Sequence, residues 1–237
     1  MNSKYEKTLD ENFDKALELC SNSYFYDDLI EFLKNGNIPE KQFAALEISE
    51  LKNQEDAGIF LSNLINCDGK IREAVAQKFS EFIQYSKYQE YFSKFPLILA
   101  KSTIDINANI SRMVIDGLVY LKDFSEFGQS YAGQLLEYIK EAFEGLDKII
   151  YKDKKYTINK QMFKLYWCLE GLNYYSQYVS KDVLKEILEK SIVLSEYTVR
   201  EKAAQLIIKY SNDDDFAELV KKIREDENYY VRKYVKS

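Results

Sequence analysis

One motif recurs along this chain and limits what the chain can fold into. It consists of a polar residue, two variable positions, an apolar residue and a basic residue, followed by apolar residues three, four and seven positions after the basic one. The clearest copy runs from Asp68 through Ile71 and Arg72 to Phe79. Because this spacing places the apolar side chains on one stripe of a helix, each copy predicts an amphipathic helix. Complete or partial copies are centred on Lys41, Arg72, Ser111, Asn159, Arg200 and Arg232.

A second amphipathic segment precedes each of these motif helices, so the sequence predicts a series of helix pairs. Neighbouring motifs lie 31 to 48 residues apart, which is typical of helix-pair repeats with insertions. Pro96 is expected to divide the third preceding segment, because proline lacks the N–H that a helix interior needs. We expect residues 8–20 to form an N-terminal capping helix. The preceding segments cover residues 25–35, 54–66, 88–105, 124–148, 181–194 and 213–225.

Residue types at the predicted helix boundaries agree with this division. Pro39 suits the first turn of a helix, where a missing N–H does no harm. The acidic run at 213–215 suits the positive end of a helix dipole, and we prefer this interpretation to a cation site because the ligand spacing of a calcium loop is missing. Four residues are of types that commonly cap helix N-termini: Asp68, Asn107, Ser195 and Asn228.

Composition narrows the class of protein further. With 8 glycines and 2 prolines in 237 residues, the chain has too few turn residues for an all-β sandwich. It has no apolar run of about 18 residues, so no transmembrane helix is expected. Three widely spaced cysteines fit a reducing compartment, and we expect a cytoplasmic protein. The net charge of -6 argues against nucleic acid as a partner, since phosphate neutralisation needs a basic surface.

The motif resembles the second helix of a HEAT repeat, and the copies within 54–84 and 182–211 resemble the HEAT-like repeats of phycobilin lyases. This resemblance covers about residues 25–237. It implies an all-α, armadillo-like fold: a right-handed α-α superhelix of about six helix pairs, forming a single domain over residues 1–237. Residues 1–24 would be its N-terminal cap, and an irregular connection would lie near 149–157.

In the HEAT family, the basic residue of the motif often pairs with an acidic residue, and the second helices line the concave face. The resemblance therefore implies a ladder of such pairs. Arg72, Arg200 and Arg232 match the basic position, and Lys41 matches it in part. Serine and asparagine replace the basic residue at 111 and 159, so we expect the ladder to be interrupted at the centre.

The sequence offers little catalytic chemistry. It contains no histidine, which removes histidine-dependent nucleophile pairs and zinc sites. No cysteine pair has metal-ligand spacing, and no phosphate-binding loop occurs. We therefore predict no catalytic, cofactor-binding or metal-binding residue. An enzyme or enzyme-accessory protein of lyase-like or nucleic-acid-processing HEAT type remains the alternative, although the glycosylases of that architecture have a basic, tryptophan-lined groove and this chain is acidic with one tryptophan.

We instead predict a scaffold that binds a protein partner through the concave face. Homo-oligomerisation through the terminal repeats is a further possibility. Trp167 is the leading anchor, with Lys160 and Lys164 on the same strip to receive an acidic peptide or helix. The tyrosine-rich clusters near residues 85–92 and 166–178 fit either the core or such a surface. Outward positions on the second helices select Gln42, Leu46, Glu73, Gln77, Arg112, Asp116, Lys160, Lys164, Trp167, Glu201 and Gln205.

Overall fold

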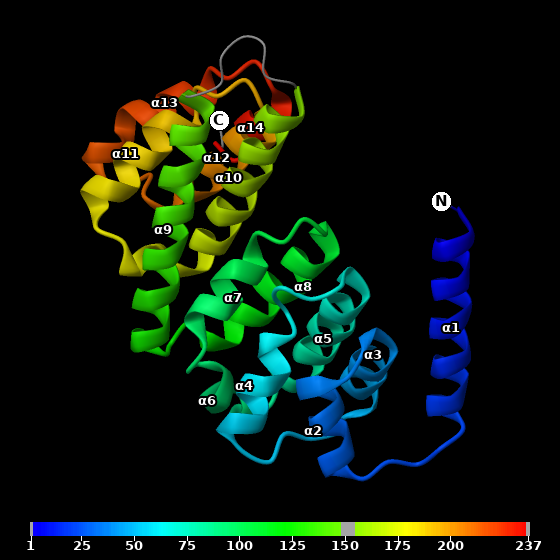
Figure 1. Cartoon of the computed structure of the whole chain (residues 1–237). Helices are drawn as coiled ribbons and strands as arrows, with labels where there is room; N and C mark the ends of the chain where they lie inside the picture. Colours follow the sequence, from blue (N-terminus) through cyan, green and yellow to red (C-terminus); the bar gives the residue numbers. More distant parts are fainter. Residues whose placement is uncertain (1, 148–154, 236–237) are drawn as a thin grey trace. The chain divides into compact units, whose positions relative to one another are not determined.

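The computed structural model describes residues 2–147 and 155–235, and the side chains of 11–147 and 160–235. Within these ranges every regular element is a helix, and no strand occurs (Figure 1). The all-α fold predicted from the sequence is confirmed for this part of the chain. The residues cluster into two compact units, Met1–Leu121 and Lys122–Ser237. The single domain over residues 1–237 stays a prediction.

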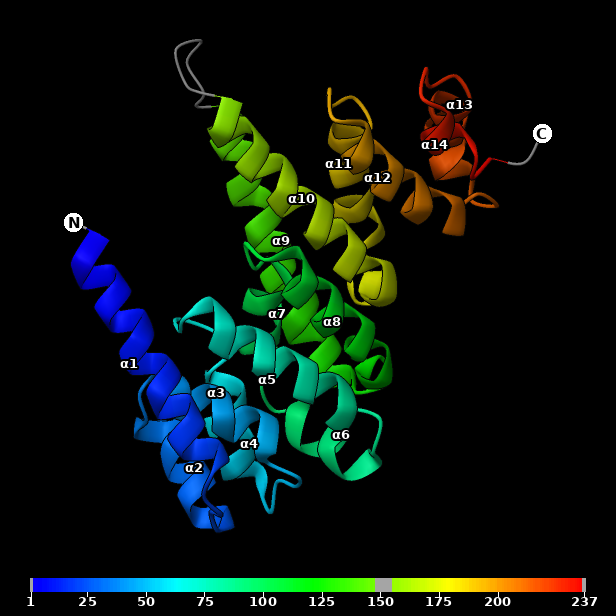
Figure 2. The ribbon, with the colours of Figure 1, turned by 90° about the vertical axis from the view of Figure 1, so that its right-hand side faces the viewer.

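The first unit contains a leading helix and three helix pairs. The second helices α3, α5 and α8 pack side by side, with α5 in contact with both of the others (Figure 2). Pro96 stands at the start of α7, so the predicted break in residues 88–105 is confirmed. The elements are α1 (Asn2–Cys20), α2 (Tyr26–Asn35), α3 (Ile38–Glu47), α4 (Gln54–Ser62), α5 (Gly69–Phe82), α6 (Ser86–Phe92), α7 (Pro96–Thr103), α8 (Ala108–Leu118) and the 3-10 turn η1 (Val119–Leu121).

The second unit contains three helix pairs. Its second helices α10, α12 and α14 follow the same arrangement, with α12 packed against both of the others. The longest helix pair, α9 with α10, makes the most extensive contact in this unit. The elements are α9 (Ser125–Asp147), α10 (Lys155–Tyr175), the turn η2 (Ser176–Tyr178), α11 (Lys181–Ser191), α12 (Tyr197–Lys209), the turn η3 (Asp214–Phe216), α13 (Ala217–Arg224) and α14 (Tyr229–Arg232).

The apolar positions of the motif form the core, as predicted. In α5, Val75, Ala76 and Phe79 are fully buried. The corresponding positions of α8 and α12 are buried as well. Since removing a large apolar side chain from water stabilises a fold by about 1.5–3 kcal/mol, these stripes hold the stacked helices together. The residues in α8 are Val114, Ile115 and Leu118, and those in α12 are Ala203, Ala204 and Ile207.

The helix boundaries follow the predicted caps with one correction. Side chains of Asp68, Asn107 and Asn228 accept hydrogen bonds from backbone N–H groups in the first turns of α5, α8 and α14. Ser195 does not cap α12; Glu196 does, because its carboxylate accepts from both the N–H and the hydroxyl of Thr198. The cap therefore lies at the polar position of the motif, one residue after Ser195.

The connection expected near residues 149–157 falls mostly outside the described residues. The helix α10 begins at Lys155, so the last part of the expected connection is helical. In the described part of the chain, no helix is both long enough and apolar enough to cross a membrane.

Candidate binding surface

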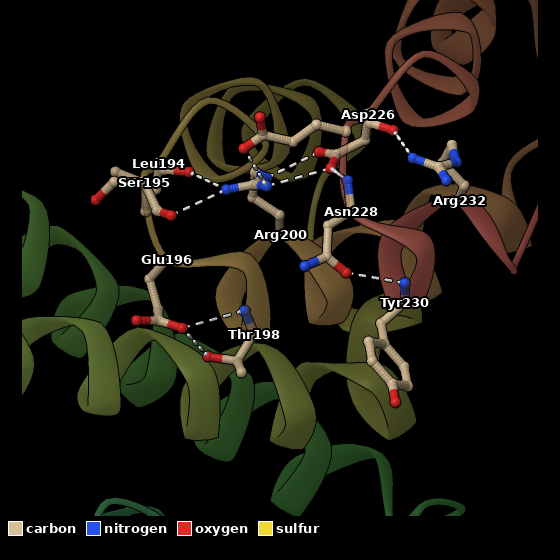
Figure 3. Close-up of polar contacts among 10 residues, drawn as sticks. Leu194, Ser195, Glu196, Thr198, Arg200, Asp226, Asn228, Tyr230 and Arg232 are labelled. Carbon is tan, nitrogen blue, oxygen red and sulfur yellow. Dashed lines mark hydrogen bonds and ion pairs between the residues drawn. The ribbon is translucent and has the colours of Figure 1, made fainter.

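An arginine–aspartate contact connects successive helix pairs at the base of the second helices. In the second unit, Arg200 of α12 contacts Asp226, which lies in the loop before α14 (Figure 3). The Nε–Oδ2 distance is 2.8 Å and the Nη2–Oδ1 distance is 3.2 Å. The remaining guanidinium nitrogen donates to the carbonyl oxygens of Leu194 and Ser195 at 2.9 and 3.0 Å. One side chain therefore ties its own loop to the next one.

The first unit contains the same contact. Arg72 Nε lies 2.7 Å from Asp105 Oδ2, Nη2 lies 3.1 Å from Oδ1, and Nη1 donates to the carbonyl oxygen of Cys67. Ser111 occupies the basic position of the next helix, and its hydroxyl donates to the carbonyl oxygen of Asp105 at 3.1 Å. Arg232 donates in the same way to the carbonyl oxygen of Asp226. Serine thus keeps the contact to its own loop but cannot continue the ladder.

The charge of Asp226 is stabilised by these neighbours. Burial alone would raise the pKa of its carboxyl group. The hydrogen bonds from Arg200 and from the backbone N–H of Asn228, together with the charges of Arg200 and Arg232, instead hold that pKa below its ordinary value. The ladder is therefore a structural element, in which arginine and aspartate satisfy each other close to the core.

Five of the six predicted surface residues of the first unit are exposed. Glu73 and Gln77 lie on α5, and Arg112 and Asp116 lie on α8, which packs against α5. On α3, Leu46 is 39% exposed and Gln42 is partly covered. The outward positions of the motif are therefore correctly predicted here, and they form a polar strip of mixed charge.

In the second unit the predicted anchor is wrong. Trp167 is 5% exposed, and its ring packs against Phe163 and Tyr166, with centroid distances of 6.0 and 4.9 Å. The reason is that α10 packs against both α9 and α12, so two of its faces are covered. Lys160 is exposed as predicted, whereas Lys164 is paired with Glu141 of α9 at 3.1 Å. The proposed strip for an acidic peptide is therefore not available as a continuous surface.

The predicted residues on α12 take part in a layer of lysine, glutamate and tyrosine that spans the second helices. Glu201 Oε1 lies 2.9 Å from Nζ of Lys233 and accepts a hydrogen bond from the Tyr234 hydroxyl. Gln205 donates to the same hydroxyl at 2.6 Å. Both predicted residues are half-buried and serve contacts between α12 and the chain around α14.

A second lysine makes an equivalent contact between α10 and α12. Lys202 Nζ lies 2.7 Å from Glu170 Oε2 and 5.1 Å from the centre of the Tyr166 ring. Burial lowers the pKa of Lys202, but the hydrogen bond and charge of Glu170 outweigh burial and raise it overall. These charged groups of the second helices are thus paired within the protein.

A depression of about 400 Å³ lies on this face between α10 and the start of α12. Its floor includes Trp167, whose indole Nε1 has no hydrogen-bond acceptor among the described residues. Two polar side chains of the α12 cap contribute to its edge. The arrangement combines an apolar floor with a few polar groups, as small binding pockets do. The lining residues are Met162, Phe163, Tyr166, Trp167, Glu196 and Thr198.

Three exposed tyrosines beside this depression were not predicted as surface residues. Tyr197 lies between two residues that line the depression and is 39% exposed. Its ring lies 6.2 Å from that of Tyr230, which in turn lies 5.7 Å from that of Tyr229. Tyr229 and Tyr230 are 66% and 53% exposed. We call this the tyrosine cluster.

The sequence did contain a signal for the tyrosine cluster. All three residues occupy the two variable positions between the cap and the apolar residue of the motif, and those positions point away from the core. By contrast, the two tyrosine-rich clusters identified in the sequence are divided between buried and partly covered positions. Phe92 and Tyr175 are fully buried, and Tyr88 is nearly so, whereas Tyr85 is exposed.

The buried carboxylates among the described residues have structural partners. Asp56 accepts a hydrogen bond from the Tyr26 hydroxyl, and Asp105 and Asp226 bind arginines. Lys181 pairs with both Asp213 and Asp215, and Asp213 caps the turn η3, as predicted for this acidic run. In the described part of the chain, no group of three or more cysteine, aspartate or glutamate side chains is placed to hold a metal ion.

The helices and their contacts define an all-α protein built from stacked helix pairs. No protein-family model and no curated protein matches the sequence. The chain is similar in structure to an archaeal HEAT-like repeats protein from Thermococcus onnurineus NA1, with 11% identity, a TM-score of 0.46, and coverage of 90% of this chain and 78% of that chain. It is also similar to an engineered protein, with 12% identity, a TM-score of 0.46, and coverage of 87% of this chain and 92% of that one.

Proposed function

We propose that this chain is a HEAT-like binding module that holds a protein partner on the face formed by its second helices. The observation that carries the proposal is the tyrosine cluster beside the depression of α10 and α12. Tyrosine is suited to such contacts, because it combines a large rigid apolar area with a hydrogen-bonding hydroxyl. Contiguous exposed apolar patches mark interaction sites more often than scattered apolar side chains do.

The depression and the tyrosine cluster form one contact area in this proposal. An aromatic or aliphatic side chain of the partner enters the depression. The tyrosines surround this contact and exclude water.

The enzyme alternative needs acidic groups that are free to act on a substrate. The buried carboxylates described above accept hydrogen bonds from arginine or tyrosine and support the fold. No observation on the described residues favours a reaction over binding.

The proposal is tested with peptides selected against the whole chain from a random displayed library. A selected peptide should bind the native protein and lose about tenfold or more in affinity with the double variant Tyr197→Ser/Tyr230→Ser, measured by calorimetry. The matched control is Tyr85→Ser/Tyr120→Ser, which replaces two exposed tyrosines of the first unit. Selected peptides that bind both double variants as well as the native protein would contradict the proposal.

A further inference from the structure

A second groove lies in the same unit, between the first helices α9 and α11. Each of these helices packs against the second helix of its own pair, α10 or α12. The space between them forms a groove of about 490 Å³. The groove is formed by the first helices, whereas the depression described above is formed by the second helices. It is therefore a separate surface.

The floor of the groove is apolar and continuous along both helices. On α9, Leu136, Ile139 and Phe143 follow the three- and four-residue spacing that places side chains on one face of a helix. On α11, Val183 and Ile187 are spaced in the same way. Val183 is 40% exposed, and Leu136 and Phe143 are partly exposed. The floor can therefore be reached by another molecule.

The rim of the groove is acidic. Four carboxylates and two ammonium groups line it, and all six side chains are exposed. One of the two lysines, Lys190, already pairs with Glu186 at 2.7 Å and lies 5.9 Å from the centre of the Phe143 ring. The rim therefore carries an excess of negative charge. Its residues are Glu137, Lys140, Glu144, Asp147, Glu186 and Lys190.

We propose that this groove binds a basic amphipathic helix of a partner protein. The lining of α9 extends from Leu136 to Asp147, which is about 16 Å of helix at 1.5 Å per residue. A partner helix of three turns matches this length, with apolar residues at every third or fourth position on the floor and lysine or arginine against the rim. The charge of the rim repels nucleic acids and anionic membranes, and so selects a cationic peptide surface.

The test uses two designed helical peptides as probes. Both carry leucine at positions i, i+3 and i+7, and they differ only in having lysine or glutamate at the remaining positions. The binding of each labelled peptide to the whole chain is measured by fluorescence anisotropy at low salt. The lysine peptide should bind, the glutamate peptide should not, and added salt should weaken the binding of the lysine peptide.

Charge reversal at the rim then locates the site. The double variant Glu137→Lys/Asp147→Lys should weaken binding of the lysine peptide about tenfold or more, and should bind the glutamate peptide better than the native chain does. The matched control, Glu189→Lys/Asp123→Lys, changes the net charge equally at exposed residues of the same unit that do not line the groove. Val183→Ser, which alters only the floor, should weaken binding without loss of fold.

Three results would overturn the proposal: no binding of the lysine peptide to the native chain, equal binding of both peptides, or equal loss in the rim and control variants. Circular dichroism and thermal unfolding of each variant separate a lost site from a lost fold. The Tyr197→Ser/Tyr230→Ser variant should leave binding of the lysine peptide unchanged. Each of the two binding proposals can therefore be contradicted without the other.

Discussion

Arg200 and Asp226 form a two-point contact in which a guanidinium edge faces a carboxylate edge, with N–O distances of 2.8 and 3.2 Å. The two side chains are 8% and 11% exposed, so the contact is largely shielded from water. Arg72 and Asp105 repeat it in the first unit, with side chains 16% and 8% exposed. Each contact joins the loop before one second helix to the loop before the next.

Removing the arginine should therefore destabilise the second unit. Arg200→Met leaves the carboxylate of Asp226 poorly solvated and without its cation. Removing one partner of a buried ion pair lowers the free energy of unfolding by about 3 kcal/mol at the lower end of the usual range. Urea unfolding of the variant should show a decrease of this size. As a control, Arg224→Met replaces an exposed arginine of the same unit and should change the free energy of unfolding by less than about 0.5 kcal/mol. Equal losses in the two variants would contradict the assigned role of the contact.

The same contact predicts a dependence of stability on acid. Asp226 has a pKa below its ordinary value of 3.8 in the folded chain. Its contribution to stability is therefore complete above about pH 4 and is lost as the pH falls through the folded-state pKa. Thermal unfolding between neutral and acid pH should show a shallower fall for Asp226→Asn than for the native protein. Parallel curves for the two proteins would rule out a role for Asp226 in the acid response.

Trp167 should behave as a core residue. Because its side chain is 5% exposed, Trp167→Ala should lower the free energy of unfolding by about 3–5 kcal/mol, whereas Trp167→Phe keeps most of the packing and should cost less. It is the only tryptophan in the chain, so its fluorescence reports directly on burial. A blue-shifted emission with weak quenching by acrylamide is expected. A red, easily quenched emission and a stable alanine variant would place this side chain at the surface.

Two glycines of α9 allow alanine substitutions at a crowded and at an open position of the same helix to be compared. A methyl group added at Gly128 would lie 2.2 Å from the Tyr178 ring, which is held by a hydrogen bond from its hydroxyl to the carbonyl oxygen of Lys122. Overpacking of this kind costs about 1–3 kcal/mol, so Gly128→Ala should lower stability. Nothing lies within 4 Å of the corresponding position at Gly133, and Gly133→Ala should raise stability by about 0.5–1 kcal/mol, the usual helix preference for alanine over glycine. Thermal unfolding of both variants should therefore shift in opposite directions. Shifts of the same sign would mean that Tyr178 does not approach α9 as described.

The sequence predicted the helices well because one motif encodes both the cap and the buried stripe. The break at Pro96 and the caps at Asp68, Asn107 and Asn228 follow from local chemistry, and all are found. The arginine positions of the ladder were also predicted, but their partners were not. Asp105 and Asp226 each lie two residues before a capping asparagine, where the carboxylate also accepts the N–H of that asparagine. This local signal is visible in the sequence only once the partner arginine is known.

The surface was harder to predict, because exposure depends on how many neighbours a helix has. The outward positions of the motif are exposed on α5 and α8, as predicted. The prediction of exposure is wrong at Trp167, because α10 is covered by both α9 and α12. The motif copy at Asn159 is also only partial, so it does not define the buried face of α10 well. The grooves depend on the distance between helices that are remote in sequence, such as α9 and α11, and no periodicity within one helix contains that information.

The position of Asp226 also limits how the chain can be shortened. It follows α13, and the helix boundaries alone assign it to the final helix pair. A chain cut after Glu225 would nevertheless retain Arg200 in the shielded base of α12 without its counter-ion. A truncation point chosen only from the ends of the helices would thus destabilise the preceding helix pair, α11 and α12. A shortened protein should end either after α14 or well before α12.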